Sequence, residues 1–354
     1  MDDVLVVLKT GVTEALDKVP VHFQTTLRCV PHYVVFSDFA EDIGGVHVHD
    51  ALQNMDSEVK RTVPDFDIYN RIQQQGRAGL ESNDFADEAN SAIGKPNNPG
   101  WKLDKWKFLP MVQETLKYKP DAKWYVFMEA DTYFSWGTLM EWLSHFDASK
   151  PHYIGTETQI ADVIFAHGGS GFVLSRPAMQ LASDEYATRT TELNEYTDGH
   201  WAGDCVLELD EFTKGFYREP WCFAAAAFHH LSAEDIQDLA QYELHRWRLT
   251  QKTVLLHKDV FKELIYPDLS DVRDNWDNLS DEEQLVVSSF NDCKSICTND
   301  PGCVQFAYRG GKCFTGKTPR LGVRNPEAQS GWIVRRVKDM MDHALPCSKP
   351  SFGL

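Results

Sequence analysis

The sequence predicts an α/β fold with parallel strands, followed by a small disulfide-rich α+β module. Apolar runs alternate with helix-like segments through the first two-thirds of the chain, and five of the eight cysteines fall between Cys293 and Cys347. A chain of 354 residues is long enough for two domains. We expect a first domain at residues 1–275 and the module with the C-terminal tail at residues 276–354.

The composition is that of a soluble globular protein, with 42% hydrophobic and 25% charged residues. The formal net charge of -18 disfavours nonspecific nucleic-acid binding and docking on an anionic membrane, because both need basic patches. The longest apolar run, Cys222 to Phe228, is far short of the roughly 20 residues that span a bilayer. The first residues, "MDDVLVVLKTG", lack the basic region of a signal peptide, and an anchor upstream stays open.

The first apolar runs predict a β-α-β unit. "VLVVLK" (Val4 to Lys9) and "PHYVVFSD" (Pro31 to Asp38) have the pattern of buried strands. The segment between them, "TEALDKVPVHFQTTLRCV", has helical apolar spacing despite Pro20. Such spacing favours a parallel pair with a right-handed crossover.

A long polar segment, residues 73–100, predicts a surface loop. "LDKWKFLPMVQETLKY" then predicts a helix with Asp104 as its N-cap and a kink at Pro110. The remaining elements expected in this part are strands at "HYIGTE" and "VIFAHGGSGFVLS" and helices after Pro177 and Gly203.

The last quarter of the chain predicts a second unit. Ser280 with Glu283 has the pattern of a capping box, which predicts that a helix begins there. "CKSICTNDPGCVQFAYRGGKCF" predicts a short helix and two strands around Gly310 and Gly311, and "SGWIVRRV" predicts a further strand.

The clustered cysteines favour a disulfide framework. A zinc site is the alternative, but "CKSIC" has three intervening residues and no histidine follows at finger spacing. Asn278-Leu279-Ser280 is a glycosylation sequon, which agrees with a secretory-pathway compartment.

Two carboxylates, Glu129 and Asp131, follow the apolar run in "KWYVFMEADTYFSW". Burying a carboxylate without a partner is costly, so either protein cations or a bound metal must neutralise the pair. Mg²⁺ and Mn²⁺ prefer oxygen ligands and accept a diphosphate into their coordination sphere. In open α/β sheets ligands bind at such strand ends. A solvated acidic turn is the structural alternative.

Glycines and an aspartate are further candidates. Gly168, Gly169 and Gly171 in "HGGSGFVLS" allow the backbone to approach a ligand closely, or else form a tight turn. Asp204 in "HWAGDCVLELDEF" is either a general base at the rim of a cleft or the cap of a helix.

Histidines and lysines complete the set of candidates. His229 and His230 in "AAAAFHHLSAEDI" are either metal ligands or structural side chains. Lys105 and Lys107 are either counter-charges for a diphosphate or ordinary helix cations.

The order of five segments resembles the fringe-like glycosyltransferases of family 31, the family of core 1 β1,3-galactosyltransferase. These segments are "DKWKFL", "KWYVFMEADTYF", "GGSGFVLS", "WAGDCVLEL" and "FHH". The resemblance covers roughly residues 1 to 260. It implies a GT-A (Rossmann-like) fold, a UDP-sugar donor with Mn²⁺ or, alternatively, Mg²⁺, inversion of configuration and commonly a β1,3 linkage.

The resemblance also assigns residues to a metal. Asp131 resembles the aspartate that binds the ion directly, and Glu129 stands where another aspartate is usual. Ala130 replaces a further acid of the family pattern. His229 resembles the metal-binding histidine that follows phenylalanine, so the resemblance implies that Asp131 and His229 converge on one divalent ion.

The other implied roles concern the substrates. Asp204 resembles the catalytic aspartate that deprotonates the acceptor hydroxyl, although Gly203 replaces the acid that usually precedes it. The remaining implied positions lie around the UDP or in the glycine turn at the donor and acceptor sites: Thr10, Asp38, Lys105, Gly168 and Gly169.

The cysteine-rich tail resembles a PAN/apple module, and the combination resembles fungal family 31 enzymes. This resemblance implies the pairs Cys293–Cys313 and Cys297–Cys303. Such modules bind proteins or glycans, or simply pack. For the other four cysteines the even total is the only indication of disulfide pairing. They are Cys29, Cys205, Cys222 and Cys347.

The function implied is a metal-dependent inverting transfer of a hexose, galactose favoured, from a UDP-sugar to a glycan or glycoprotein hydroxyl, in β linkage. N-acetylglucosamine, glucose and galactofuranose stay open as donor sugars. The expected location is the Golgi lumen, through a type II anchor absent from this chain, or outside the cell. The alternatives are a non-catalytic glycan-binding protein, favoured by Ala130 and the tail, and a metal phosphoesterase or nucleotidyltransferase, which would release phosphate or pyrophosphate rather than UDP.

Overall fold

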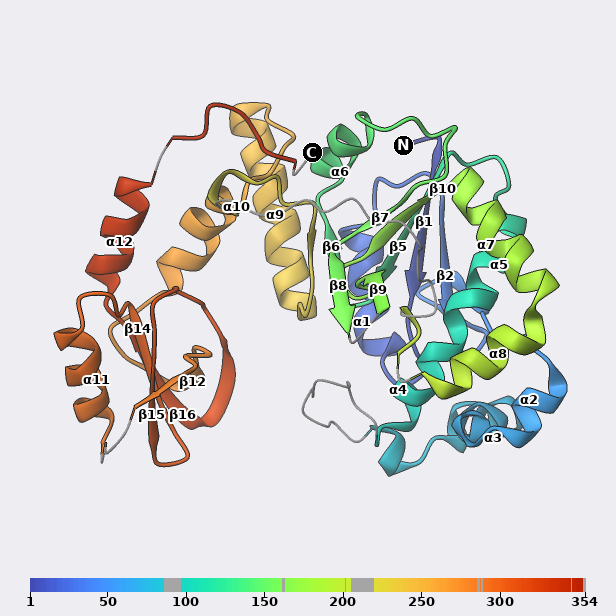
Figure 1. Ribbon diagram of the computed structural model, residues 1–354, viewed down its shortest axis with the longest axis horizontal. Coiled ribbons are helices and arrows are strands. Elements are labelled where there is room, and N and C mark those ends of the chain that lie inside the picture. Colours follow the sequence, from blue (N-terminus) through green and yellow to red (C-terminus); the bar gives the residue numbers. More distant parts are fainter. Residues whose placement is uncertain are drawn as a thin grey trace. The chain divides into compact units, whose positions relative to one another are not determined.

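The computed structural model describes residues 1–85, 97–160, 163–200, 202–204, 220–284, 287, 289–344 and 346–352. The described residues group into two compact units (Figure 1). Unit 1 comprises Met1–Lys214 with Ala226–Thr253, and unit 2 comprises Gly215–Ala225 with Val254–Leu354.

Unit 1 is built on a seven-stranded sheet in the order β3-β4-β2-β1-β5-β10-β7. Its centre is parallel, since β1 pairs in parallel with β2 and β5, and β2 pairs in parallel with β4. The outer strands β3 and β10 run antiparallel to their inner neighbours. The strands are β1 (Val4–Lys9), β2 (Tyr33–Ser37), β3 (Glu41–Ile43), β4 (Val46–Asp50), β5 (Trp124–Glu129), β7 (Tyr153–Gly155) and β10 (Phe172–Ser175).

Helices cover both faces of this sheet (Figure 1), and its central strand β1 is buried along its whole length and apolar up to Lys9. Leu5 and Val7 of β1 pack with α5 (Phe108–Tyr118) and α7 (Arg176–Thr188). Val6, between them, packs on the other face with α1 (Ala15–Gln24) and α6 (Trp136–Leu143). The predicted β-α-β unit is confirmed, because α1 connects the parallel strands β1 and β2.

Further elements complete unit 1. They are α2 (Ser57–Thr62), α3 (Asp67–Gln75), α4 (Pro99–Asp104), α8 (Thr190–Gly199), α9 (Ala233–Thr250), the pair β8 (Glu157–Ile160) and β9 (Val163–Ala166), the pair β6 (Tyr133–Phe134) and β11 (Ala227–Phe228), and 3₁₀ turns at Pro64–Phe66, Gly76–Gly79, Ser82–Phe85 and Lys105–Lys107. Helical residues therefore occupy both ends of the long loop expected at residues 73–100, since 3₁₀ turns follow α3 and α4 begins at Pro99. Residues 86–96 lie outside the described part. The helix expected after Gly203 also falls outside it, whereas the helix after Pro177 is confirmed as α7.

The prediction that Asp104 caps a helix is wrong. Asn98 is the cap instead, with its side chain accepting a hydrogen bond from the backbone N–H of Trp101 at the start of α4. The chain then forms a 3₁₀ turn before α5, where Pro110 cannot donate to a carbonyl in the preceding turn. Asp104 is drawn into ion pairs with lysines, which a local capping pattern does not reveal.

Unit 2 contains a five-stranded antiparallel sheet in the order β12-β16-β14-β15-β13. Its elements are 3₁₀ turns at Pro220–Cys222 and Tyr266–Asp268, α10 (His257–Val260), a π-helical turn at Phe261–Ile265, β12 (Arg273–Asp277), β13 (Glu282–Gln284), α11 (Phe290–Asn299), β14 (Gln305–Arg309), β15 (Lys312–Gly316), β16 (Val323–Trp332) and α12 (Val334–His343). The helix and two strands expected around Gly310 and Gly311 are confirmed. The segment "SGWIVRRV" is strand only through Trp332, and α12 follows.

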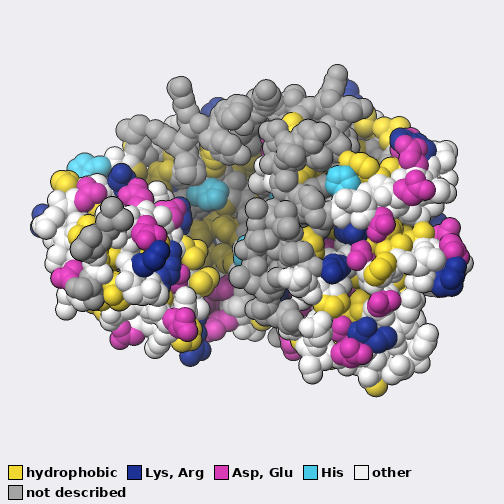
Figure 2. All heavy atoms as spheres, turned by 60° about the horizontal axis from the view of Figure 1, so that its bottom comes forward, with side chains coloured by type: hydrophobic (Ala, Val, Ile, Leu, Met, Phe, Trp, Pro, Cys, Tyr) yellow, Lys and Arg dark blue, Asp and Glu magenta, His cyan; other side chains and the backbone are white. Residues whose placement is uncertain are grey.

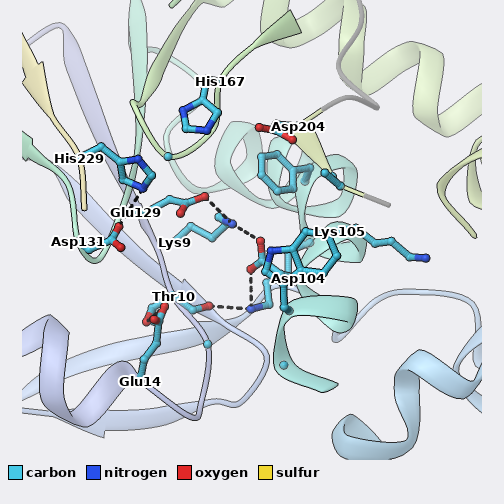
Figure 3. A pocket seen from close by; sticks show the side chains of 18 of the residues that line it. Lys9, Thr10, Glu14, Asp104, Lys105, Glu129, Asp131, His167, Asp204 and His229 are labelled. Carbon is cyan, nitrogen blue, oxygen red and sulfur yellow. Dashed lines mark hydrogen bonds and ion pairs between the residues drawn. The ribbon is translucent and has the colours of Figure 1, made fainter. Parts of the chain in front are cut away.

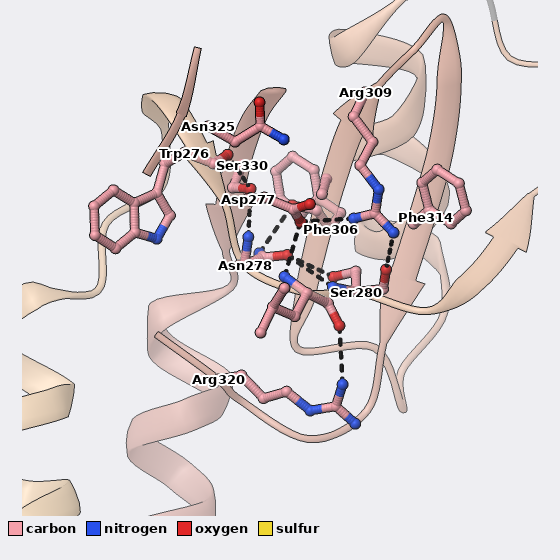
Figure 4. Close-up of polar contacts among 12 residues, drawn as sticks. Trp276, Asp277, Asn278, Ser280, Phe306, Arg309, Phe314, Arg320, Asn325 and Ser330 are labelled. Atoms are coloured by element: carbon pink, nitrogen blue, oxygen red, sulfur yellow. Dashed lines mark hydrogen bonds and ion pairs between the residues drawn. The ribbon is translucent and has the colours of Figure 1, made fainter. Parts of the chain in front are cut away.

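The capping box expected at Ser280 is wrong, and so is the sequon as a glycosylation site. Residues after Ser280 pair as β13 with β15, and the helix begins only at Phe290, capped by Ser289. Asn278 is fully buried and its amide donates to the carbonyls of Phe306 and Gly331 (Figure 4). Its side chain therefore stabilises the sheet and has no room for a glycan.

Disulfides fasten unit 2. The implied pairs Cys293–Cys313 and Cys297–Cys303 are both present; the first joins α11 to β15, and the second joins α11 to the turn before β14. A third, Cys222–Cys347, closes a loop of 125 residues and was not predicted. Cys29 is free and exposed, while Cys205 lies outside the described residues.

Basic and acidic side chains are interspersed on the face shown in Figure 2, without a basic patch on its described residues. In the described residues no helix combines the length and apolarity needed to cross a bilayer.

We expect peptide mapping without reduction to recover Cys222–Cys347, Cys293–Cys313 and Cys297–Cys303 as linked pairs, with Cys29 alkylated. These pairs lie within disulfide distance in the folded chain, whereas Cys29 has no described partner. A Cys222 peptide joined to a cysteine other than Cys347 would contradict the structure.

Candidate active site

A cavity of about 500 Å³ opens in unit 1 at the carboxyl ends of β1 and β5 (Figure 3). The parallel pairing of these strands places Lys9 beside Glu129 in the sheet. Residues from α1, α4, the glycine turn before β10 and the segment after β11 line the rest of the cavity. The sheet thus collects charged side chains from distant parts of the sequence at one edge, as is usual for open α/β sheets.

The floor of the cavity is a network of buried ion pairs. The Lys9 ammonium lies 2.9 Å from Glu129 Oε1 and also contacts Asp104. Lys107 lies 3.0 Å from Asp38 Oδ2 and 3.1 Å from Asp104 Oδ1, and both Lys107 and Asp38 are only 1% exposed. Two lysines and three carboxylates therefore alternate in space, so that each lysine contacts two carboxylates.

This network fixes the charge of its members. Burial opposes ionisation of Lys9, but the carboxylates of Asp104 and Glu129 outweigh it and raise the pKa of Lys9. Burial likewise opposes ionisation of Asp104, and Lys9 and Lys107 outweigh it, so the pKa of Asp104 is lowered. Lys9 and Asp104 are therefore charged at neutral pH, and Glu129 lies against Lys9.

A second cluster lies beside this network: Asp131, His229 and His230 offer ligand atoms within 4.8 Å of one another. Asp131 follows β5, and the pairing of β6 with β11 brings the segment after Phe228 to it. His229 Nε2 lies 3.3 Å from Asp131 Oδ1, and the backbone N–H of Leu231 donates to the Asp131 carbonyl. The predicted proximity of Asp131 and His229 is thus observed, whereas Glu129 lies outside this cluster and pairs with Lys9.

The donor set of this cluster fits a divalent cation. Asp131 Oδ1 is buried and accepts no hydrogen bond from the described residues. A buried oxygen in this state is costly unless a cation satisfies it. Burial alone would raise the pKa of Asp131, but His229 and Lys18 outweigh it and lower the pKa, so the side chain is a carboxylate. One carboxylate with imidazole nitrogens is a common ligand set for divalent ions.

Two close packings hold the cluster in place. Thr132 Oγ1 donates to the carbonyl of Gly169 at 2.6 Å, which ties the acidic turn to the glycine turn. A Cβ on Gly169 would lie 2.1 Å from Cε1 and 2.3 Å from Nε2 of His229. The absence of a side chain at Gly169 therefore leaves the space that the His229 ring occupies.

A buried histidine supports the acidic turn from behind. His22 Nε2 lies 2.8 Å from the carbonyl of Ala130, and Nδ1 lies 3.2 Å from Thr26 Oγ1. Burial lowers the pKa of His22, so the neutral ring donates from Nε2 and accepts at Nδ1. Sequence analysis did not single out His22; the available signal was a polar residue on the apolar face of a predicted helix.

Asp204 lies in a different environment. Its Oδ2 accepts a hydrogen bond from the backbone N–H of Gly168 at 2.8 Å (Figure 3 shows the side chain). Burial raises the pKa of Asp204, and the nearby Glu129 adds to the effect against Gly168 and Lys9. The preceding Gly203 packs so closely that a Cβ there would lie 2.4 Å from Cδ2 of Phe108. Glycine before Asp204 is thus a packing requirement of this chain.

The other predicted positions lie at or below the cavity. Thr10 is buried, and its carbonyl accepts a hydrogen bond from Lys107 at 2.8 Å. Asp38 lies deeper, where Oδ1 accepts from the backbone N–H of Val12. Lys105 lines the cavity, but its ammonium pairs with Asp65 at 2.9 Å and its side chain points away from Glu129 (Figure 3).

Unit 1 is therefore an α/β domain with a charged cavity and a candidate metal cluster at the carboxyl edge of a parallel sheet. A model of the Fringe-like family matches residues 1–259, which is most of the chain, and the chain belongs to that family. The Fringe-like family is a family of glycosyltransferases, whose members generally use a UDP-sugar and a divalent metal. Among curated proteins, no sequence matches this chain.

Replacing Lys107 by methionine should lower the free energy of unfolding of unit 1 by about 3–5 kcal/mol, because Asp38 would be left buried without its cation. Denaturant titration of the purified chain measures this loss. Lys117→Met, on an exposed lysine of α5, should change it by less than about 0.5 kcal/mol. Adding Asp38→Leu to Lys107→Met should restore part of the stability, and a tolerated single variant would argue against the network.

Replacing Gly169 by alanine should weaken binding of a divalent ion by at least about tenfold, because the new methyl group would displace His229. Calorimetric titration with Mn²⁺ measures the effect. Gly199→Ala is the matched control, since nothing lies within 4 Å of a Cβ there. Equal Mn²⁺ affinity in both variants would remove His229 from the metal site.

Proposed function

We propose that this chain is a metal-dependent inverting glycosyltransferase that moves a hexose, galactose favoured, from a UDP-sugar to a hydroxyl of a glycan or glycoprotein. One observation carries the proposal: Asp131 Oδ1 is a buried carboxylate oxygen that accepts no hydrogen bond within the described part of the chain and lies 3.3 Å from His229 Nε2, in the cavity of a Fringe-like domain. Such an oxygen is the ligand that a divalent cation requires.

The metal position is assigned to Asp131 and His229, with His230 as a further nitrogen within reach. Because imidazole nitrogen suits transition ions better than Mg²⁺, Mn²⁺ is the favoured ion. Bound there, the ion would offset the charge of the departing diphosphate. Glu129 is assigned to the donor pocket, where it keeps Lys9 charged and in place at the cavity floor.

The donor pocket owes its shape to the surrounding backbone. Gly169 lines the cavity without a side chain, and the adjacent Gly168 donates its backbone N–H to Asp204, which also lines it. Thr10 and Asp38 are held rigidly by Lys107, which suits a role as a support for bound nucleotide. Lys105 would act as a counter-charge for the diphosphate from the rim of the cavity, although its ammonium pairs with Asp65 in the described conformation.

Asp204 is assigned as the general base. Its burial raises its pKa, which makes the carboxylate a better proton acceptor than an exposed one. In an inverting displacement the acceptor hydroxyl attacks the anomeric carbon while the nucleotide leaves from the opposite face. Asp204 accepts the proton of that hydroxyl, and its hydrogen bond from Gly168 keeps one oxygen oriented during the transfer.

The cellular setting is inferred from chemistry. The structure holds three disulfides, which form in oxidising compartments. Together with the family, they support a place in the secretory pathway, in the Golgi lumen or outside the cell. The helix, sheet and paired cysteines of unit 2 support its assignment as a PAN/apple-like module of a fungal-type enzyme.

The function is tested by incubating the chain with Mn²⁺ and a panel of UDP-sugars, with and without candidate glycans, and measuring UDP. The proposal expects UDP release that depends on the metal and increases with an acceptor, with UDP-galactose the best donor. Release of phosphate or pyrophosphate would indicate the phosphoesterase or nucleotidyltransferase alternative. Metal-dependent sugar-nucleotide binding without any UDP release would indicate the glycan-binding alternative.

Substitutions of Asp204 and Asp131 should affect different steps, turnover in the first case and UDP binding in the second. Asp204→Asn should lower turnover by about 10²–10⁴-fold with little change in UDP affinity, because it removes the base but not the metal. Asp131→Asn should weaken metal-dependent UDP binding itself. Turnover assays and calorimetry on both variants measure the two effects. An active Asp204→Asn variant would return Asp204 to a structural role and make Glu195, Asp198 or Glu208, the last of which lies outside the described residues, the next candidates.

A further inference from the structure

We infer that Lys18 is a movable counter-cation of the metal site, which neutralises Asp131 when no nucleotide is bound and pairs with the diphosphate when the metal–nucleotide complex binds. This inference rests on the proposed function and adds a residue that sequence analysis did not identify. It follows from where Lys18 lies, what it contacts and how the charges around Asp131 add up.

Lys18 projects from α1 into the cavity beside the metal cluster. Its ammonium lies 2.8 Å from Glu14 Oε2 and 3.5 Å from Asp131 Oδ2. The side chain thus places a lysine ammonium, a cation at neutral pH, in direct contact with a candidate metal ligand.

Lys18 differs from the other lysines that line the cavity. The side chains of Lys9, Lys105 and Lys107 are at most 10% exposed and are held in ion pairs. The Lys18 side chain is 38% exposed, and its closest partner is on its own helix. Among the described cavity lysines it can therefore change partners with the least cost in burial.

The two oxygens of Asp131 face different groups. Oδ1 lies toward His229, at 3.3 Å, and Oδ2 lies toward Lys18, at 3.5 Å. A divalent ion held by Oδ1 and the imidazole would thus share one carboxylate with an ammonium, and the two cations repel each other. The resident lysine accordingly weakens the site for a free metal ion.

The sign of this effect reverses when a nucleotide binds. Glu14, Asp131 and Lys18 together leave one negative charge, and a divalent ion turns this into one positive charge. A diphosphate is then attracted to the cluster, and Lys18 supplies a second cation for it. Without the lysine the metal-loaded cluster would be neutral and would attract the diphosphate less.

Removing the charge of Lys18 should therefore change two affinities in opposite directions. For Lys18→Gln we expect Mn²⁺ alone to bind about two- to tenfold more tightly than to the wild type. We expect UDP at saturating Mn²⁺ to bind about tenfold more weakly, since a charge-assisted contact is lost. A purely structural lysine would change both affinities in the same direction or change neither.

Calorimetric titrations with Mn²⁺ and then with UDP test this on the full chain. Lys18→Arg retains the charge and should keep both affinities close to those of the wild type. Lys117→Gln removes a lysine that pairs with Glu114 on α5, outside the cavity, and should change neither. Glu14→Gln removes a negative charge and should give the reverse pattern, with weaker Mn²⁺ and tighter UDP binding.

The outcomes separate the inference from the proposed function. A wild-type chain that binds no UDP in the presence of Mn²⁺ contradicts the proposed function and the inference together. A wild-type chain that binds UDP, with Lys18→Gln shifting both affinities the same way or neither, overturns the inference alone. If Lys18→Gln fails to fold, Glu14→Gln replaces it in the test. Weaker Mn²⁺ binding with tighter UDP binding would then support the inference, and any other combination would overturn it.

Discussion

The neutralisation of buried charge at the carboxyl ends of the parallel strands is the constraint on which the rest of unit 1 depends. Lys107 and Asp38 are almost completely buried, and Lys9 bridges Asp104 and Glu129 beside them. Removing Lys107 or Lys9 would leave Asp38 or Glu129 without its lysine partner in a medium that solvates a charge poorly. The network therefore makes a charged floor, and Asp131, outside it, is a carboxylate available to a cation.

The contacts around Asp131 turn this remaining carboxylate into a site. The pairing of β6 with β11 brings His229 to it, Gly169 leaves room for the imidazole ring, and His22 holds the acidic turn from behind. Lys18 reaches the same carboxylate from the first helix. Groups far apart in the sequence thus contact the carboxylate of Asp131. The carboxyl edge of an open α/β sheet brings such groups together, and ligands bind there.

Much of this arrangement is predictable from local patterns in the sequence, and the failures have a common physical cause. The strands and α1 follow from apolar periodicity, and the resemblance places His229 near Asp131 and pairs four cysteines correctly. Asp104 and Ser280 were misassigned because capping patterns are local, whereas ion pairs and strand pairing recruited them over long distances in the chain. Lys18 has no pattern of its own, and His22 is marked only as a polar residue on the apolar face of a predicted helix; their contacts across the fold reveal what they do.

The central claim, that Asp131 and His229 form a metal site for a nucleotide diphosphate, is tested most directly by anomalous diffraction. Crystals soaked with Mn²⁺ and UDP should show one strong manganese peak within about 2.0–2.6 Å of Asp131 Oδ1 and His229 Nε2. Density for the diphosphate should complete the coordination of that ion. A manganese peak elsewhere in the cavity, or nucleotide density without metal at these two side chains, would contradict the account.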